Sequence, residues 1–535
     1  MGHTDGASPN MLRLDLLPPE ILHHIFSGLG PRDLGRLPRT CRVFHNHVKG
    51  NQQLCKDIYL KTFDTPAVSD LDWERELHDF VRLSTLCADA KVKEKSHELP
   101  FVCETVDRLL KHASPTGETQ NDSGTHASSR NAAAVARLFR EEPARLAFLC
   151  RSFIFECAQH RERPKIMPLP PSESHQMSAK LHCLYGRPIF NCGRTRSTRL
   201  YPFAWSKVYD MRQYTRRTKW GPFMDDDTGR VDWEKVEAIM IVIGSNIRSQ
   251  NLVAKVFSDL WERSFAGSWS GSYIPAPNRG IRDLDLQDPY GVAGTWLRVV
   301  CFIDYNDFWR FNDLDGADLH PVPREVARPP LDVGEATRVI IVKVHVTSVQ
   351  PPGDDDGKDL PVVHFEGISR SIDDTWDANT SSDIRVDQGT VRLTKEGDVR
   401  WTTFSIFNGQ PRWRSEGIQI GGVGSARGVL GNWFAEDYNR AGPCGPTAYF
   451  KVSDRASNPE SDDRQISFHD FLPIMDFHAN LASDEDDDED FVVGEWGEDE
   501  EDEDMEDEDE REAIAQDLAA LAAAEVDMID AVLSG

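Results

Sequence analysis

The glycine cluster at residues 421–428, Gly421-Gly422-Val423-Gly424-Ser425-Ala426-Arg427-Gly428, is the stretch of this chain that most invites a phosphate-binding interpretation. A phosphate loop needs Gly-Lys-Ser/Thr at the start of a helix, and a dinucleotide-binding turn needs G-x-G-x-x-G after a strand. Here no lysine follows, and Arg427 stands where the last glycine would be. The cluster therefore predicts a glycine-rich turn or a close approach of backbone between strands.

Motifs of catalysis are missing from the sequence. It contains no G-x-S-x-G, no H-E-x-x-H and no kinase signature, and its many carboxylates have no spacing that fixes a pair. The ten cysteines include no C-x-x-C pair, which favours a reducing cytosol or nucleus. We expect no catalytic residue, no metal ligands and no cofactor, although a structural zinc stays open.

Basic and aromatic residues alternate through the segment 194–220. Its members are Arg194, Arg196, Arg199, Arg212, Arg216, Arg217 and Lys219, with Tyr201, Phe203, Trp205, Tyr209, Tyr214 and Trp220. Such a mixture suits stacking on single-stranded nucleic acid. It also suits an acidic or phosphorylated peptide, whose oxygens match arginine forks. The plainest alternative is an aromatic core with a solvated basic edge, and we favour it.

The elements that would position any site begin with short helices at the amino terminus. Leu22, Ile25, Phe26 and Leu29 have the spacing i, i+3, i+4 and i+7 of one apolar helical stripe. Prolines 18 and 19 suit a helix start, and Pro38 should end or kink the next helix near residue 37. So short a module cannot enclose all of its apolar side chains, so some should face a partner.

This region resembles the F-box family. The resemblance rests on Leu17-Pro18-Pro19-Glu20-Ile21-Leu22, Ile25-Phe26, Leu29, Pro31-Arg32-Asp33-Leu34 and Cys41-Arg42-Val43-Phe44, in the order and at the spacing of that family. It implies docking on a Skp adaptor and, through the adaptor, on a cullin. The residues expected to contact the adaptor or to support the contact directly are Leu17, Pro18, Ile21, Leu22, Ile25, Leu29 and Leu34.

The second half of the chain changes to a β pattern. Strands are expected at 296–303, 339–346, 360–365, 389–393, 399–407 and 447–452, because these runs are rich in β-branched and aromatic residues and turn residues separate them. Short helices such as 232–240 precede them, and the apolar run 238–243 is short enough to be a buried strand. Many short strands favour a mostly antiparallel barrel or sandwich.

This half is similar to fungal F-box proteins with a C-terminal β-domain, and more loosely to the β-barrel of animal F-box proteins that present substrates to the ligase. The similarity rests on three segments, 267–273, 414–422 and 427–433. It implies a substrate-receptor domain without naming the substrate. Residues that dominate binding hot spots, namely Trp, Tyr and Arg, suggest a substrate contact at Trp269, Tyr273, Arg414, Arg427 and Trp433.

Charge is distributed unevenly along the chain. The formal net charge is −29, yet residues 484–510 hold 20 acidic residues and no basic one. That run predicts a solvated, disordered tail rather than an acidic folded body. No apolar run approaches the length of a membrane span, and the amino terminus lacks the apolar stretch of a signal peptide.

Together these features predict an α+β protein: a helical F-box and helical linker, a mostly antiparallel β-barrel or β-sandwich and a disordered acidic tail. The expected divisions are a leader at 1–11, the F-box at 12–63, a helical linker at 64–180 with a flexible loop at 114–131, a β-rich domain at 181–465, an acidic tail at 466–512 and a helix at 513–535.

The function expected is that of the substrate-recognition subunit of a Skp–cullin–F-box ubiquitin ligase, a non-catalytic adaptor in the cytoplasm, the nucleus or both. Its partners would be a Skp adaptor, a cullin and an unknown target protein, without membrane or nucleic acid. The alternative is an F-box scaffold or nucleic-acid-associated protein without ligase activity. An unrecognised enzyme in the β-domain is a third class, which no residue specifically predicts.

Overall fold

The computed structural model describes residues 14–454 and residue 466. Gaps in this range lie at 69, 90, 117–125, 160–172, 189–193, 250–256, 258–259, 262, 276–282, 313–327, 373–384, 408 and 440–441. Contacts divide the chain into two units, residues 1–476 and 477–535, and every described residue belongs to the first. The expected leader, the acidic tail from 467 on and the C-terminal helix lie outside the described residues.

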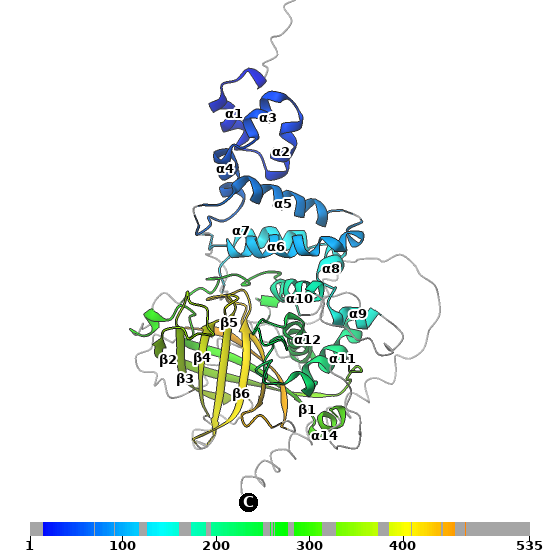
Figure 1. Ribbon diagram of the computed structural model, residues 1–535, viewed down its shortest axis with the longest axis vertical. Coiled ribbons are helices and arrows are strands. Elements are labelled where there is room, and N and C mark those ends of the chain that lie inside the picture. Colours follow the sequence, from blue (N-terminus) through cyan, green and yellow to red (C-terminus); the bar gives the residue numbers. More distant parts are fainter. Residues whose placement is uncertain are drawn as a thin grey trace, which may run out of the picture. The chain divides into compact units, whose positions relative to one another are not determined.

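Short helices occupy the first described part of the chain (Figure 1). They are η1 (Leu14–Leu16), α1 (Pro19–Phe26), α2 (Pro31–Arg36), η2 (Leu37–Arg39), α3 (Arg42–Val48) and α4 (Gln52–Thr62). Pro19 begins α1 because the first helical position needs no backbone donor. As Pro38 predicts, α2 ends at Arg36 and a 3₁₀ turn follows. The predicted stripe of α1 divides: Leu22 and Phe26 are buried, whereas Ile25 points outward.

A second group of helices follows the first. It comprises α5 (Trp73–Cys87), η3 (Val92–Glu98), α6 (Leu99–Lys111), α7 (Arg130–Leu138), α8 (Glu142–Phe148) and α9 (Phe153–Gln159). Pro143 lies in the first turn of α8, where it separates this helix from α7 as expected. The buried carboxylate of Asp64 accepts from the backbone N–H groups of Ser114, Arg130 and Asn131 at 3.2, 2.9 and 3.2 Å. One side chain thus joins the end of α4 to the start of α7.

Replacing Asp64 with asparagine should destabilise this junction by about 2 kcal/mol, because an amide NH₂ would then face backbone donors in a buried site. Hydrogen exchange of the α7 amides measures the effect directly, since local opening exposes them. Asp70→Asn, an exposed change in the same connection, is the matched control and should leave that exchange unchanged. Equal protection in both variants would contradict this role of Asp64.

Three longer helices precede the strands: α10 (Glu173–Tyr185), α11 (Arg194–Tyr209) and α12 (Trp233–Ser249). Two short helices, η4 (Met211–Gln213) and η5 (Asp285–Gln287), lie between α11 and the first strand. The β-rich region was expected from residue 181, but strands begin only at Gly294. The apolar run 238–243 is not a strand and belongs to α12, where it is buried. A helix that is buried on all sides has no polar stripe to reveal its helical period. The short apolar run was therefore compatible with a buried strand.

Eight antiparallel strands form a closed barrel in the order of the sequence, which decides between the barrel and the sandwich. They are β1 (Gly294–Ile303), β2 (Glu335–Gln350), β3 (Val362–Ser371), β4 (Arg385–Leu393), β5 (Val399–Phe407), β6 (Gln410–Gln419), β7 (Val429–Ala435) and β8 (Cys444–Ser453). A helix, α14 (Tyr305–Phe311), follows β1. The six expected strands are present, β5 with the expected bounds and the other five with shifted ends, whereas β6 and β7 were missed.

Closure comes from the pairing of β1 with β8, for example Leu297 opposite Phe450. The glycine cluster forms the connection between β6 and β7, as predicted: Gly421 has φ +85°, and a Cβ there would lie 2.5 Å from the backbone of Ser268. A side chain would therefore clash, which explains the glycine.

Both faces of part of the barrel wall are buried, because side chains alternate between the interior and the outside. Interior apolar residues such as Trp296, Val344 and Trp401 form a core of their own. Outward residues such as Leu297 and Phe450 join the larger core with the helices. Helix α12 contacts β1, β2, β7 and β8, and it lies beside the barrel in Figure 1. The helices thus cover one side of the barrel.

Candidate functional site

A face of exposed apolar side chains lies on the first helices. Large apolar residues with at least 39% exposure are few among the described residues, and five of the nine fall before residue 44. They are Leu14 at 53%, Leu16 at 73%, Ile21 at 48%, Ile25 at 39% and Val43 at 42%. An exposed apolar cluster of this kind marks a surface that another protein covers.

The seven residues predicted for adaptor contact take three positions in this region. Pro18, Ile21 and Ile25 are exposed. Leu17 and Leu29 are half-buried and pack against the core, whereas Leu22 and Leu34 are buried. The first three can touch a partner, and the other four support them. Leu14, Leu16 and Val43 are also exposed here, although the prediction did not include them.

Polar contacts hold this face in place on the helices behind it. His23 Nε2 lies 2.8 Å from Asp57 Oδ2 in α4, and Lys61 donates to the carbonyl of Ser27 at 2.8 Å. Arg32 donates to the carbonyl of Ser84 in α5 at 3.1 Å. Because these contacts join α1 and α2 to α4 and α5, the exposed residues are presented by an ordered support.

The interior of the barrel provides a second site. Arg298 of β1 is 5% exposed and donates to three hydroxyls, of Thr447 at 3.3 Å, Ser405 at 3.2 Å and Ser415 at 2.9 Å. Ser405 in turn donates to Asp387 Oδ1 at 2.7 Å, and Arg298 lies 4.0 Å from the same oxygen. A buried arginine needs such partners, since an unpaired buried charge is costly.

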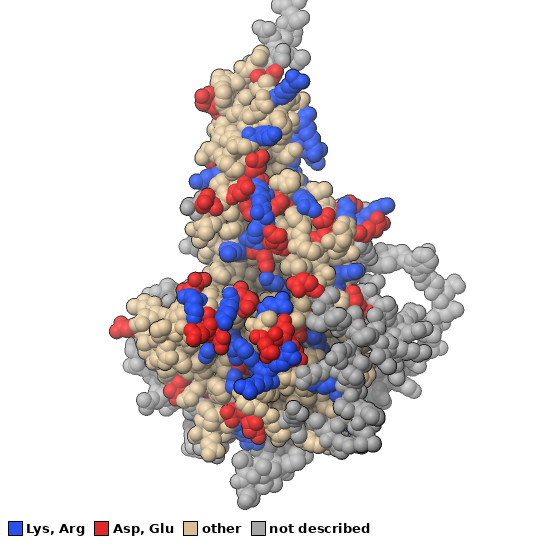
Figure 2. Space-filling view, viewed as in Figure 1, with Lys and Arg blue, Asp and Glu red and all other residues tan. Residues whose placement is uncertain are grey.

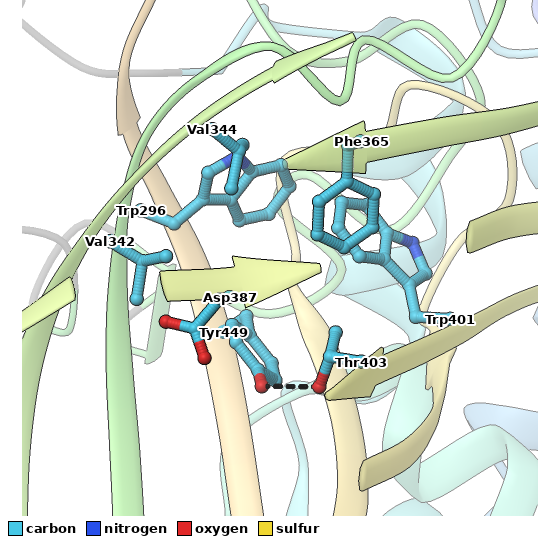
Figure 3. A pocket seen from close by; sticks show the side chains of 8 residues that line it. All are labelled: Trp296, Val342, Val344, Phe365, Asp387, Trp401, Thr403 and Tyr449. Atoms are coloured by element: carbon cyan, nitrogen blue, oxygen red, sulfur yellow. Dashed lines mark hydrogen bonds between the residues drawn. The ribbon is translucent and has the colours of Figure 1, made fainter. Parts of the chain in front are cut away.

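A small cavity adjoins this pair (Figure 3). The rings of Trp296, Phe365 and Trp401 lie together on one side of it, and Asp387 lies near Tyr449 on the other. Asp387 is 4% exposed, and its Oδ2 has no hydrogen-bond partner among the described residues. The space holds about one water molecule, so any larger guest requires side chains to move. The cavity therefore offers one buried acceptor, Asp387 Oδ2, to which a hydrogen-bond donor can bind.

The five residues predicted for substrate contact do not come together at one surface. Trp269, Arg427 and Trp433 are 1%, 4% and 8% exposed, so this prediction is corrected for them: they support the fold. Tyr273 and Arg414 are partly exposed. The sequence showed residue types that favour binding, but types alone do not reveal burial.

Arg427 instead supports the junction between α10 and the barrel. Its guanidinium donates to the carbonyl of Tyr185 at 2.8 Å and also to that of Leu260. Burial lowers the pKa of Arg427 to about 9, because no carboxylate is paired with it in the described structure. Gly186 leaves the space that this side chain fills, since a Cβ there would lie 1.3 Å from Nη2. The positive charge meets the negative end of α10.

The basic and aromatic segment 194–220 contains both buried aromatic residues and basic residues in ion pairs. Side chains 194–201 lie outside the described ones. Tyr209 and Tyr214 are buried, Lys207 lies 3.5 Å from Asp232, and Arg212 lies 2.8 Å from Asp210. These contacts agree with the interpretation of an aromatic core and a basic edge. Lys219 differs from them, because the described structure contains no acceptor for its ammonium group.

The described part of the chain lacks two further kinds of site. No helix in that part has the length and apolar character needed to cross a membrane. Nor do three or more His, Cys, Asp or Glu side chains gather there in a way that could hold a metal ion.

Comparison with known proteins covers the region of the first of these sites. Residues 14–61 match the family model of the F-box-like domain. This places the chain among the proteins that carry such a domain, and F-box domains typically bind Skp adaptors within Skp–cullin–F-box complexes. The exposed apolar face lies within the matched residues. The curated proteins and the solved structures contain no significant match to the chain.

Proposed function

We propose that this protein is the substrate-recognition subunit of a Skp–cullin–F-box ubiquitin ligase. The observation that carries the proposal is the exposed apolar face of Ile21 and Ile25 within residues that match an F-box-like domain. A Skp adaptor would cover this face and link the chain to a cullin. The protein itself would be a non-catalytic adaptor of the cytoplasm or nucleus, contributing proximity and orientation to a transfer performed by other subunits.

The barrel is the part of the chain that we propose to hold the target. Closed eight-stranded barrels can hold one small group inside. Asp387 supports this assignment, because its unpartnered Oδ2 beside the cavity would accept from an N–H or O–H group of a target. Tyr449 and Trp401 would pack against the same group. Such entry requires rearrangement of the aromatic rings, since the present space is small.

The experiment compares the full-length protein with the double variant Pro18→Ala/Ile21→Asp in cells. Cullin should co-purify with the wild type and be lost from the variant, because the exposed face is altered while the barrel is not. Proximity labelling with and without proteasome inhibition then reveals targets: neighbours of the wild type should accumulate under inhibition.

The double variant should label the same neighbours without inhibition, since it binds them and no longer delivers them. Retention of cullin by the variant would refute adaptor docking through α1. A set of neighbours indifferent to the proteasome would instead favour a scaffold without ligase activity.

A further inference from the structure

A strained turn holds Lys219 in place between α11 and the barrel. Two consecutive residues other than glycine, Lys219 and Trp220, have φ of +52° and +56°. This backbone conformation is unfavourable for residues with a side chain, and it persists only where the surroundings enforce it. Here Thr215 and Thr218 hydrogen-bond each other across the turn, and the buried Asn432 donates to the carbonyl of Trp220.

The turn brings the Lys219 ammonium to the same aromatic ring as Arg400, that of Phe223. Lys219 Nζ and Arg400 Cζ lie 5.8 and 5.1 Å from the centroid of the Phe223 ring. Arg400 Nε donates to Glu416 Oε2 at 2.9 Å, and Arg414 Nε donates to Glu416 Oε1 at 3.0 Å. The side chains of Arg400 and Arg414 are only 13% and 19% exposed. One carboxylate therefore pairs with both arginines, and Lys219 adds a third positive charge beside the same ring.

The titration of these groups reflects the positive charge around Phe223. Burial opposes ionisation of Glu416, yet the charges of Arg400 and Arg414 outweigh it and hold the pKa of Glu416 below its usual value. Burial and then the charge of Arg400 lower the pKa of Lys219. Placing a lysine against arginines without an acceptor is unfavourable by itself.

Neighbouring acids reduce the imbalance but do not remove it, because each already has a basic partner and only Asp225 and Asp227 share one. Asp356 lies 3.5 Å from Arg392, and Asp355 lies 3.3 Å from Lys395. Asp225 and Asp227 lie 3.6 and 3.1 Å from Arg217. Figure 2 shows acidic and basic side chains mixed over the visible face, so a site must be judged by its immediate contacts. Around Phe223 those contacts are positive.

We propose that Lys219 and Arg400 bind a phosphate group beside the Phe223 ring. A phosphate monoester or free phosphate carries close to two negative charges at neutral pH, which the two cations Lys219 and Arg400 can meet. Arginine forks and lysine ammonium groups are the usual donors to phosphate oxygens. Arg400 uses Nε for Glu416, and no acceptor among the described residues meets its Nη atoms. The strain at Lys219 keeps the second donor in position before the anion arrives.

The test titrates the full chain with inorganic phosphate at constant ionic strength, by calorimetry. The wild type should bind, and Lys219→Met should bind at least about tenfold more weakly, because a charge-assisted hydrogen bond is lost. Arg216→Met is the matched control: it lies in the same turn and is exposed, and it makes no ion pair with a described acid, so its removal frees none. This control should bind phosphate like the wild type.

Lys219→Gly distinguishes an effect of Lys219 on phosphate binding from an effect on the stability of the fold. Glycine relieves the positive φ, so this variant should unfold at the same temperature as the wild type or higher, and yet bind phosphate as weakly as Lys219→Met. A second arm replaces inorganic phosphate with a peptide that carries one phosphoserine. Tighter binding of the peptide identifies a protein-borne phosphate, and equal binding identifies the free anion.

The proposal is overturned if neither probe binds the wild type at millimolar concentration. It is also overturned if Lys219→Met binds as the wild type does. Because these measurements use the protein alone, they remain valid whether or not a Skp adaptor and a cullin bind it.

Discussion

Replacing Ile21 and Ile25 together with aspartate should weaken the binding of a purified Skp adaptor by at least about 100-fold, because two apolar contacts worth about 2 kcal/mol each are lost. The two residues stand one helical turn apart on the outer side of α1 and are 48% and 39% exposed. The new carboxylates would also have to be desolvated in an apolar interface. Since both side chains already face water, the fold of the free protein should not change.

Val68→Asp is the matched control for this change. Its side chain is 48% exposed, the same fraction as that of Ile21, but it lies outside the residues that match the F-box-like domain. Adaptor affinity should be unaltered in this variant. Leu16→Asp provides a finer test, because Leu16 is the most exposed apolar residue of the face and was not predicted from the sequence. Full affinity in the double variant would show that the adaptor contacts another surface.

The local sequence predicted what depends on local physics. The start of α1 at Pro19 and the break at Pro38 follow from the chemistry of proline, and β1, β2 and β5 follow from their β-branched residues. Strands β6 and β7 were missed because the prediction relied on β-branched and aromatic residues. They contain glycines such as Gly417 and Gly431, which lower β propensity but allow close packing: a Cβ on Gly431 would lie 2.1 Å from the carbonyl of Glu416.

The interior site could not be predicted, because it depends on register between distant strands. Arg298 and Asp387 are 89 positions apart and meet only when the barrel closes with both side chains inward. A one-residue shift of either strand would turn the charge outward. The same limit explains the error at Trp269 and Arg427: their types suggested a binding surface, while the packing of 267–273 on the glycine turn buries them.

Glu335 is a further residue that no sequence pattern indicated, and it provides the second large expected effect. Its carboxylate lies at the start of β2 and accepts from Trp205 Nε1 at 2.6 Å, from the Tyr209 hydroxyl and from Asn246 Nδ2. These donors belong to α11 and α12, so one carboxylate joins both helices to the barrel. Burial raises the pKa of Glu335 to about 7, because the three hydrogen bonds offset only part of the desolvation.

The sign of the pH dependence follows from this pKa. The folded state holds the Glu335 proton up to about pH 7, whereas the unfolded chain releases it near the ordinary glutamate pKa of 4.5. The contribution of Glu335 to stability is therefore complete below pH 4.5 and is lost as the pH rises through 7. The facing groups Tyr209 and Cys301 do not titrate in this window, because burial raises the pKa of both well above their usual values.

Glu335→Gln should therefore stabilise the protein by up to roughly 3 kcal/mol at pH 8 and change little at pH 4.5, because a neutral amide removes the cost of a buried charge. Its oxygen can accept from Trp205 and Asn246, and its NH₂ can donate to the Tyr209 hydroxyl. Hydrogen exchange in α11 and α12 across pH 5 to 8 measures the difference. Glu396→Gln, an exposed change in the turn between β4 and β5, should follow the wild type at every pH. If Glu335→Gln also followed the wild type, the carboxylate of Glu335 would titrate normally in the wild type. Apolar packing alone would then hold the helices to the barrel.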